Sequence, residues 1–283
     1  MSALRKQMEA DMTVRNFSVR TRESYVASVR GLAKYYKRSP DTLTEDEVQR
    51  YLLYLIEERK LAWSSVNVTA SALKFLFNVT LKRKTAEFTV PGPHQPQTLP
   101  QILSREEVMR VIDAAANPKH RTILLTIYAA GLRVSELCHL KVADIDSGRM
   151  TLRIEQAKGA KDRYALLSPK LLKELRLYWA TYRPKTWLFP GPRNPELPLL
   201  DSTVQRIFYR AKDRAGITKR CGIHGLRHAF ATHMLEGGVN VHTIQRLMGH
   251  RDIGTTTRYF HLARAHLTQT PSPLELPQQK PPQ

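Results

Sequence analysis

Apolar residues recur at intervals of three and four positions through the first third of the chain, and this spacing is typical of amphipathic helices. Residues 21–36 and 63–81 both carry it. Between them, Thr44 is followed after three residues by Glu47, the pairing that forms a capping box at a helix N-terminus. The pattern therefore predicts a small helical bundle over residues 1–85.

A proline-rich stretch interrupts this periodicity. Residues 88–103 read FTVPGPHQPQTLPQIL and hold four prolines, which favour an extended linker over a helix. We therefore expect a domain boundary in this stretch. The expected organisation is a helical domain over 1–86, a linker over 87–103, a second domain over 104–268 and a proline-rich tail over 269–283.

The second domain combines helices with two short stretches of β character. Residues 121–130 are mostly apolar up to Gly131, which predicts a core helix that stops at the glycine. Residues 149–155 and 163–167 flank a turn at Gly159 and predict a hairpin. The other expected helices begin at Ser104, cover 170–182 and 203–215 (the latter capped by Asp201 or Ser202), and run from His224 to Gly237 and from Asn240 to Gly249. The expected fold is mainly α with a small antiparallel β-sheet, an α+β class.

The charge balance points to a polyanionic partner. Lysine and arginine number 45 against 25 aspartates and glutamates, which gives a net charge of +20. Residues 1–85 carry +7 of this and the remainder +13, so the excess runs through the whole molecule. Such a distribution indicates nucleic acid, ahead of an anionic membrane surface or a soluble protein that is simply basic.

Several other classes of protein do not fit the sequence. No run of eighteen apolar residues is present to span a membrane, and the first residues, MSALRKQMEADM, contain no apolar core of a secretion signal. Cys138 and Cys221 lie far apart, so they do not form a disulfide framework or a paired-cysteine zinc site. We expect a reducing cytoplasm and no membrane partner.

The densest set of reactive groups lies in residues 223–261. His224 and Arg227 stand three apart, His250 follows a helix end at which a cationic imidazole is favoured, and Tyr259 comes nine residues later. A phenol, two imidazoles and a guanidinium together suit attack on a phosphodiester without a metal.

Basic residues upstream have alternative explanations. Arg133 follows the predicted core helix and needs a partner there, either a salt bridge to Glu136 or a bound phosphate. Lys158 and Lys161 lie on the hairpin turn, where lysines are ordinarily solvated unless the hairpin leans over a phosphate. The remaining DNA-binding candidates are Lys82, Arg83 and Lys84 at the end of the first domain, and Arg206 and Arg210 on the outer face of helix 203–215.

Four motifs carry a family resemblance. They are GLRVSEL at 131–137, AKGAKDR at 157–163, HGLRH at 224–228 and LMGHRDIGTTTRY at 247–259. In this order and spacing, the chain resembles the tyrosine recombinases of the phage integrase family and is similar in layout to the bacterial Xer-like members. The resemblance implies an N-terminal helical core-binding domain followed by a tyrosine-recombinase catalytic domain.

The resemblance also implies a role for each motif residue. The implied active-site residues are Arg133, Lys158, His224, Arg227, His250 and Tyr259. Tyr259 is the implied nucleophile, which forms a 3′-phosphotyrosyl link to DNA. The two arginines clamp the non-bridging oxygens of the scissile phosphate and the two histidines complete that cradle. Lys158 is the implied general acid, with Lys161 as the alternative, and Glu136 orients its neighbours.

The implied activity is site-specific recombination, for integration or excision of mobile DNA or for dimer resolution. The covalent link conserves the energy of the phosphodiester, so no ATP, metal or other cofactor is expected. The implied partner is double-stranded DNA with a specific recombination site. A homotetramer is expected on DNA and a monomer in its absence, in the cytoplasm of a bacterium.

Three other interpretations use the same residues. A type IB-like topoisomerase would nick and reseal DNA without exchanging strands, although the small helical first domain and the linker favour a recombinase. A non-catalytic DNA-binding regulator would not need the complete set of reactive residues. His224 and His228 have a zinc-binding spacing, but no third ligand stands at a recognised distance, so no metal is expected. His228 and His233 are expected to be packing or surface residues.

Overall fold

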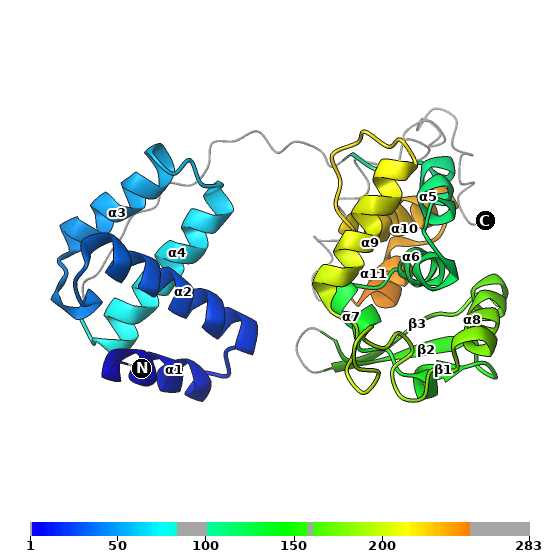
Figure 1. Ribbon diagram of the computed structural model, residues 1–283, viewed down its shortest axis with the longest axis horizontal. Helices are drawn as coiled ribbons and strands as arrows, with labels where there is room; N and C mark the ends of the chain where they lie inside the picture. The colour runs from blue at the N-terminus through cyan, green and yellow to red at the C-terminus, as the bar shows by residue number, and fades with distance from the viewer. Residues whose placement is uncertain (1, 84–100, 158–160, 250–283) are drawn as a thin grey trace, which may run out of the picture. The chain divides into compact units, whose positions relative to one another are not determined.

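The computed structural model describes residues 2–83, 101–157 and 161–249, except for the side chains of Gln156, Ala157 and Lys161. The chain divides into two compact units, Met1–Gln97 and Thr98–Gln283, each with its own hydrophobic core (Figure 1). Within the described ranges, none of the helices combines the length and the apolar character that crossing a bilayer requires.

The N-terminal unit is a helical bundle, as its periodicity predicts. Its elements are α1 (Ala3–Val14), α2 (Val19–Tyr36), the short η1 (Pro40–Thr42), α3 (Glu45–Glu57), α4 (Trp63–Phe75) and the π-helical turn η2 (Leu76–Thr80). Leu32 of α2 and Leu73 of α4 are fully buried where these two helices pack together. The predicted capping box between Thr44 and Glu47 is confirmed. The helix expected over 63–81 changes to π-helical geometry after Phe75.

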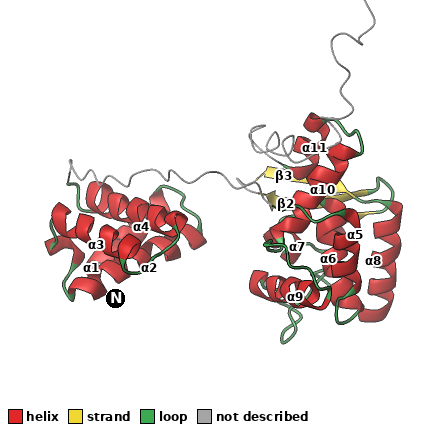
Figure 2. Cartoon of the chain, turned by 90° about the horizontal axis from the view of Figure 1, so that it is seen from above, coloured by secondary structure: helices red, strands yellow, loops and turns green. Residues whose placement is uncertain are grey.

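The C-terminal unit is organised around one apolar helix. Its helices are α5 (Arg105–Asp113), α6 (Pro118–Ala130), α7 (Val134–Cys138), η3 (Val142–Asp144), α8 (Pro169–Tyr182), α9 (Asp201–Arg214), α10 (His224–Glu236) and α11 (Val241–Met248). Figure 2 shows α6 surrounded by other helices, and it contacts α5, α7, α8, α9 and α10. Ile123 and Leu124 of α6 are fully buried, which confirms the predicted core helix.

A three-stranded antiparallel sheet completes this unit. Its strands are β1 (Ile145–Asp146), β2 (Thr151–Ala157) and β3 (Lys161–Leu166), in the order β1-β2-β3. In the hairpin, Thr151 pairs with Leu166 and Ile154 with Arg163, with an irregularity between Ile154 and Ala157. The predicted hairpin and the mainly α fold class are therefore confirmed.

Local signals at helix ends were mostly correct. Gly131 and Gly249 end α6 and α11 with φ angles of +60° and +63°, a conformation that glycine adopts without a Cβ penalty. One cap was wrong: α9 begins at Asp201 itself, with Leu200 as the N-cap residue and no side-chain cap. Asp201 is the first helical residue, where its negative charge still interacts favourably with the helix dipole.

A buried arginine cluster as the candidate active site

Glu136 lies at the centre of the site. Its side chain is only 5% exposed and accepts two hydrogen bonds from Arg133 at the start of α7. The backbone N–H of Arg133 donates to Oε2 at 2.8 Å, and its Nη1 donates to Oε1 at 2.6 Å. The carboxylate thus caps α7 and holds one guanidinium at the same time.

A second arginine reaches the carboxylate from the hairpin. Nη2 of Arg163 on β3 donates to Oε2 of Glu136 at 2.7 Å, and its side chain is 8% exposed. Nη1 of the same guanidinium donates to the carbonyl of Leu247 in the last turn of α11. Arg163 therefore joins the sheet to both α7 and α11.

A third arginine comes from α10. Nη1 of Arg227 donates to the carbonyl of Gly131 at 2.5 Å, and Nη2 donates to the carbonyl of Met248 at 2.7 Å. Its side chain is 6% exposed, and Nη1 lies 3.7 Å from Oε2 of Glu136. Both acceptors stand at helix C-termini, where backbone carbonyls lack intrahelical partners and a positive charge is favoured.

The three arginines hold three consecutive carbonyls at the end of α11. Arg163 donates to Leu247 and Arg227 to Met248. Nη2 of Arg133 donates to Gly249, the residue that ends the helix, at 3.3 Å. The cluster therefore fixes the end of α11 against β3, α10 and the start of α7. Because Arg133 is 24% exposed, it is the most accessible of the three to a ligand.

The cluster carries an excess of positive charge. Three guanidiniums face one carboxylate, which leaves a net charge of +2 in a nearly buried site. Burial alone would raise the pKa of Glu136, but the guanidinium of Arg163 and hydrogen bonds from Arg163 and Arg133 outweigh it, so the pKa is lowered. An excess of this kind in a nearly buried place favours the approach of an anion.

His224 stands beside this charge at the first position of α10. The residue is exposed, yet the packing around its ring removes enough water to lower its pKa. The positive charges of Arg227 and Arg133 lower it further, while Asp201 opposes them. The imidazole is therefore neutral near pH 7, and one ring nitrogen can accept a proton.

The structure brings together the part of the predicted site that it describes. Arg133, Glu136 and Arg227 meet at the end of α11, and His224 lies close enough to Arg133 and Arg227 for their charges to lower its pKa. The salt bridge offered as one explanation for Arg133 is present, and its role toward a phosphate stays a prediction. Outside the described residues lie Lys158, His250, Tyr259 and the DNA-binding candidate Lys84. Lys161 begins β3, but its side chain is not described.

Other DNA-binding candidates have different surroundings. Arg83 donates to the carbonyls of Leu43 and Asp41, and its guanidinium lies 5.2 Å from the ring centre of Phe77, so it also stabilises the N-terminal bundle. Lys82 beside it is exposed.

Arg206 and Arg210 lie on the exposed face of α9. They line an open hollow together with Arg214 and with His120 of α6. Neither Arg206 nor Arg210 has an ion-pair partner within the described part of the chain. This arrangement leaves both guanidiniums available to a polyanion.

Arg163 is the member of the cluster that the sequence did not assign, although it ends the AKGAKDR motif. The alternation of side chains along the predicted strand could have identified it. Side chains alternate along a strand, so residue 163 shares a face with residue 165 and with residue 167, and Ala165 and Leu167 are both buried. A charged side chain on the buried face of a strand requires a partner of opposite charge.

The other two histidines of α10 are His228 and His233. In the described ranges, no three side chains of His, Cys, Asp or Glu are placed to hold a metal ion. His233 is buried against Tyr128, whose hydroxyl lies 2.9 Å from Nδ1, and His228 is partly buried on the same helix. His233 is thus a packing residue, as expected.

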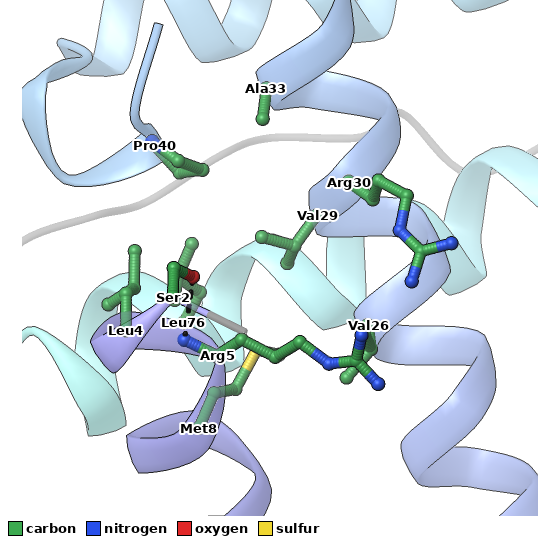
Figure 3. Close-up of a pocket in the computed structure, with 10 residues that line it drawn as sticks. All are labelled: Ser2, Leu4, Arg5, Met8, Val26, Val29, Arg30, Ala33, Pro40 and Leu76. Carbon is green, nitrogen blue, oxygen red and sulfur yellow. Dashed lines mark hydrogen bonds between the residues drawn. The ribbon is translucent and has the colours of Figure 1, made fainter.

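An apolar hollow lies in the N-terminal unit (Figure 3). It is bordered by α1, α2, η1 and η2, and its lining includes the apolar residues Met8, Val26 and Leu76. Arg5 and Arg30 extend along its border. The polar side chains in its lining are those of Ser2, Arg5 and Arg30. The lining has no carboxylate or imidazole that could act with them as an acid–base pair.

Comparison with known proteins gives consistent matches over both units. Residues 101–266 match the model of the phage integrase family, and residues 4–87 match that of the phage integrase N-terminal SAM-like domain. The chain is 47% identical over 277 residues to a protein of Sinorhizobium fredii named "Putative integrase/recombinase y4qK", covering 98% of this chain and 90% of that protein.

Solved structures show the same fold. The crystal structure of XerA recombinase is 29% identical, with a TM-score of 0.56, and the match covers 94% of this chain and 95% of the other. A lambda integrase tetramer bound to a Holliday junction has a TM-score of 0.74 at 20% identity, covering 91% of this chain and 76% of that chain.

Proposed function

Because this chain belongs to the phage integrase family and is a site-specific DNA recombinase of the tyrosine type, we propose that the arginine cluster around Glu136 binds the scissile phosphate. The observation that carries this proposal is the meeting of Arg133 and Arg227 on one buried carboxylate, with a net charge of +2. A phosphodiester has one negative charge and gains a second in the five-coordinate transition state. Preorganised guanidiniums stabilise that additional charge without a metal ion.

The proposed reaction uses Tyr259 as the nucleophile. Its phenolic oxygen attacks phosphorus, the bond from phosphorus to the 5′-oxygen breaks, and a 3′-phosphotyrosyl link forms. The leaving 5′-oxygen takes a proton from Lys158, with Lys161 as the alternative acid. The phenol must lose its proton or have its anion stabilised, and the nearby positive charges favour the second. His224 and His250 complete the phosphate cradle.

The reverse of this step rejoins the DNA. A 5′-hydroxyl from another strand attacks the phosphotyrosyl link, the tyrosine leaves with a proton, and the phosphodiester is restored. Since each step exchanges one ester for another, no ATP or cofactor is consumed. The same chemistry without a change of partner strand would be that of a topoisomerase.

The proposed substrate is double-stranded DNA with a specific site. Lys82, Arg83 and Lys84 in the first domain and Arg206 and Arg210 on α9 are proposed to contact its backbone. Exchange between two duplexes needs four active sites, so we propose a homotetramer on DNA and a monomer in its absence. The solved tetramer of lambda integrase on a Holliday junction supports this assembly by similarity.

The proposed domain limits are those expected from the sequence: 1–86, the linker 87–103, the catalytic domain 104–268 and the tail 269–283. The biological task is proposed to be integration or excision of mobile DNA, or dimer resolution, in a bacterial cytoplasm. The curated relatives named integrase/recombinase support this task.

The test is to trap the protein on DNA. A nicked duplex loses the short fragment that carries the 5′-hydroxyl, so the covalent adduct accumulates and can be counted on a denaturing gel. The full-length protein is expected to form the adduct, and Tyr259→Phe is expected to bind the same DNA without forming it. An adduct that persists in Tyr259→Phe would rule out this nucleophile. Relaxation of plasmids that lack any special site would instead favour the topoisomerase.

A further inference from the structure

Arg163 is placed to control the two arginines proposed to bind the phosphate. Its side chain is 8% exposed, and its two terminal nitrogens donate to Glu136 and to the carbonyl of Leu247. Its Nε is buried and has no hydrogen-bond partner within the described residues. The guanidinium is thus occupied by protein groups and faces away from solvent, unlike the more accessible Arg133.

We propose that Arg163 is a positioning residue for strand cleavage, which acts through Glu136 and the end of α11. This inference rests on the proposed function of the cluster. Arg163 itself does not touch the phosphate. It determines how much positive charge Arg133 and Arg227 present, and where the chain leaves α11.

Arg163 affects the charge of the cluster. Oε2 of Glu136 lies 2.7 Å from Arg163 but 3.7 Å from Arg227. Arg163 therefore takes the closer bond, and Arg227 directs its own short bonds to backbone carbonyls. Without Arg163, the cluster would fall from +2 to +1, and Oε2 would be available to close on Arg227. Both changes reduce the positive charge offered to an anion.

Arg163 also affects the geometry at the end of α11. Gly249 packs directly on the side chain of Arg163, and a Cβ at Gly249 would collide with the aliphatic part of that side chain. Arg163 also holds the Leu247 carbonyl, beside the carbonyls held by Arg227 and Arg133. Removal of Arg163 would release one of the three bonds that fix the end of α11. A displacement of about 1 Å in an active site can cost about 100-fold in rate.

The experiment compares Arg163→Met with a matched control. Arg153 lies on the neighbouring strand β2 and pairs with Asp144 and Glu155, outside the cluster, so Arg153→Met removes the same charge from the same sheet. Adduct formation is measured with the full-length protein on nicked DNA at saturating concentration, together with DNA affinity and the thermal midpoint. We expect Arg163→Met to form the adduct about 100-fold more slowly with DNA affinity retained, and Arg153→Met to match the unmodified protein.

Two further measurements separate positioning from a merely structural role. A scissile methylphosphonate lacks the non-bridging charge, so the defect of Arg163→Met should shrink on that substrate. Arg163→Lys keeps the charge but cannot reach Glu136 and Leu247 together, so its defect on ordinary DNA should be intermediate. If Arg163→Met does not fold, the rate of adduct formation by Arg163→Lys on the two DNA substrates tests the proposal by itself.

Several outcomes would overturn the proposal. They are an unchanged rate in Arg163→Met or Arg163→Lys, or an equal defect on phosphodiester and methylphosphonate DNA. A failure of the proposed function would give a different result from a failure of the role of Arg163. If the unmodified protein forms no adduct, the proposed function fails. If Arg133→Ala abolishes the adduct while the Arg163 variants retain full rate, only the role of Arg163 fails.

Discussion

Arg133 donates to both carboxylate oxygens of Glu136, through its backbone N–H at 2.8 Å and through Nη1 at 2.6 Å. The two residues are only three positions apart in the sequence, but Glu136 also contacts residues that are distant in the sequence. The same carboxylate also accepts from Arg163 and lies within ion-pair distance of Arg227. One buried acid thus determines where three basic side chains lie.

Replacement of this acid should be costly for stability. Glu136→Gln leaves three guanidiniums close together without the carboxylate, and loss of one partner of a buried ionic network typically costs about 3–5 kcal/mol. The free energy of unfolding from urea titration would measure it. Glu155→Gln is the control, because Glu155 pairs with Lys141 and Arg153 at a more exposed place, so its replacement should cost much less than that of Glu136. Equal losses in the two variants would contradict a central role for Glu136.

Gly249 should tolerate no side chain. Its φ angle of +63° is strained for other residues, and a Cβ there would meet Arg163. Gly238 is a matched control, since its φ angle is +81° and an added Cβ meets nothing within 4 Å. Gly238→Ala should cost about 1–2 kcal/mol through conformation alone. Gly249→Ala should cost clearly more, as measured by urea unfolding, and a similar cost at both positions would mean that the contact with Arg163 is unimportant.

Stability should decrease as the solution becomes acidic. Burial lowers the pKa of the four histidines His120, His224, His228 and His233 below the ordinary value of 6.5. Below about pH 6.5 the unfolded chain therefore binds more protons than the folded one, and the folded state loses stability as the pH falls toward the lowered values. Glu136 does not contribute in this window, because its pKa is lowered from 4.5. Urea titrations between about pH 8 and pH 5 would show the trend, and a stability that rises on acidification would be inconsistent with it.

The general acid can be identified with a modified leaving group. Lys158→Ala should slow cleavage of ordinary DNA by about 100-fold or more, because the 5′-oxygen then leaves without a proton. A 5′-bridging sulfur leaves readily as a thiolate, so the variant should recover much of its rate on that DNA. Lys161→Ala is the companion variant for the alternative assignment. Equal slowing of Lys158→Ala on both substrates would count against Lys158.

The exposed arginines of α9 should contribute to DNA affinity by binding backbone phosphates. Replacement of Arg206 or Arg210 by Gln should weaken binding to all sequences alike, and each replacement should reduce the slope of log affinity against log salt by about one. Arg176→Gln is the control, because Arg176 is an exposed arginine on α8 and the variant has the same net charge. If all three variants lose affinity equally, net charge rather than this face of α9 is responsible.

Short-range signals in the sequence were enough for much of the fold. The cap Thr44–Glu47, the helix start at Ser104 and the stop at Gly131 depend on residues close in sequence, so a local pattern identifies them. The cap of α9 was wrong because Asp201 and Leu200 differ by one position, and local chemistry does not resolve that difference.

The site was less predictable, because its contacts are distant in sequence. The motifs identified Arg133, Glu136, His224 and Arg227 as a group, and the salt bridge between Arg133 and Glu136 was one of two explanations offered for Arg133, but the partners of Arg227 within the protein were not predicted. The bonds from Arg163 to Leu247 and from Arg227 to Gly131 span 84 and 96 residues. No periodicity encodes such bonds, and a guanidinium gives no sign in the sequence of which carbonyl it will reach.

The three carbonyls held at the end of α11 also link the formation of the arginine cluster to the folding of the second unit. Their arginine donors are contributed by the start of α7, by β3 and by α10, at separations of up to 116 residues. Contacts of such long range form late, after loop closure has been achieved. A chain in which α11 has not docked does not bring these arginines together. The proposed phosphate site therefore requires the second unit to be folded first.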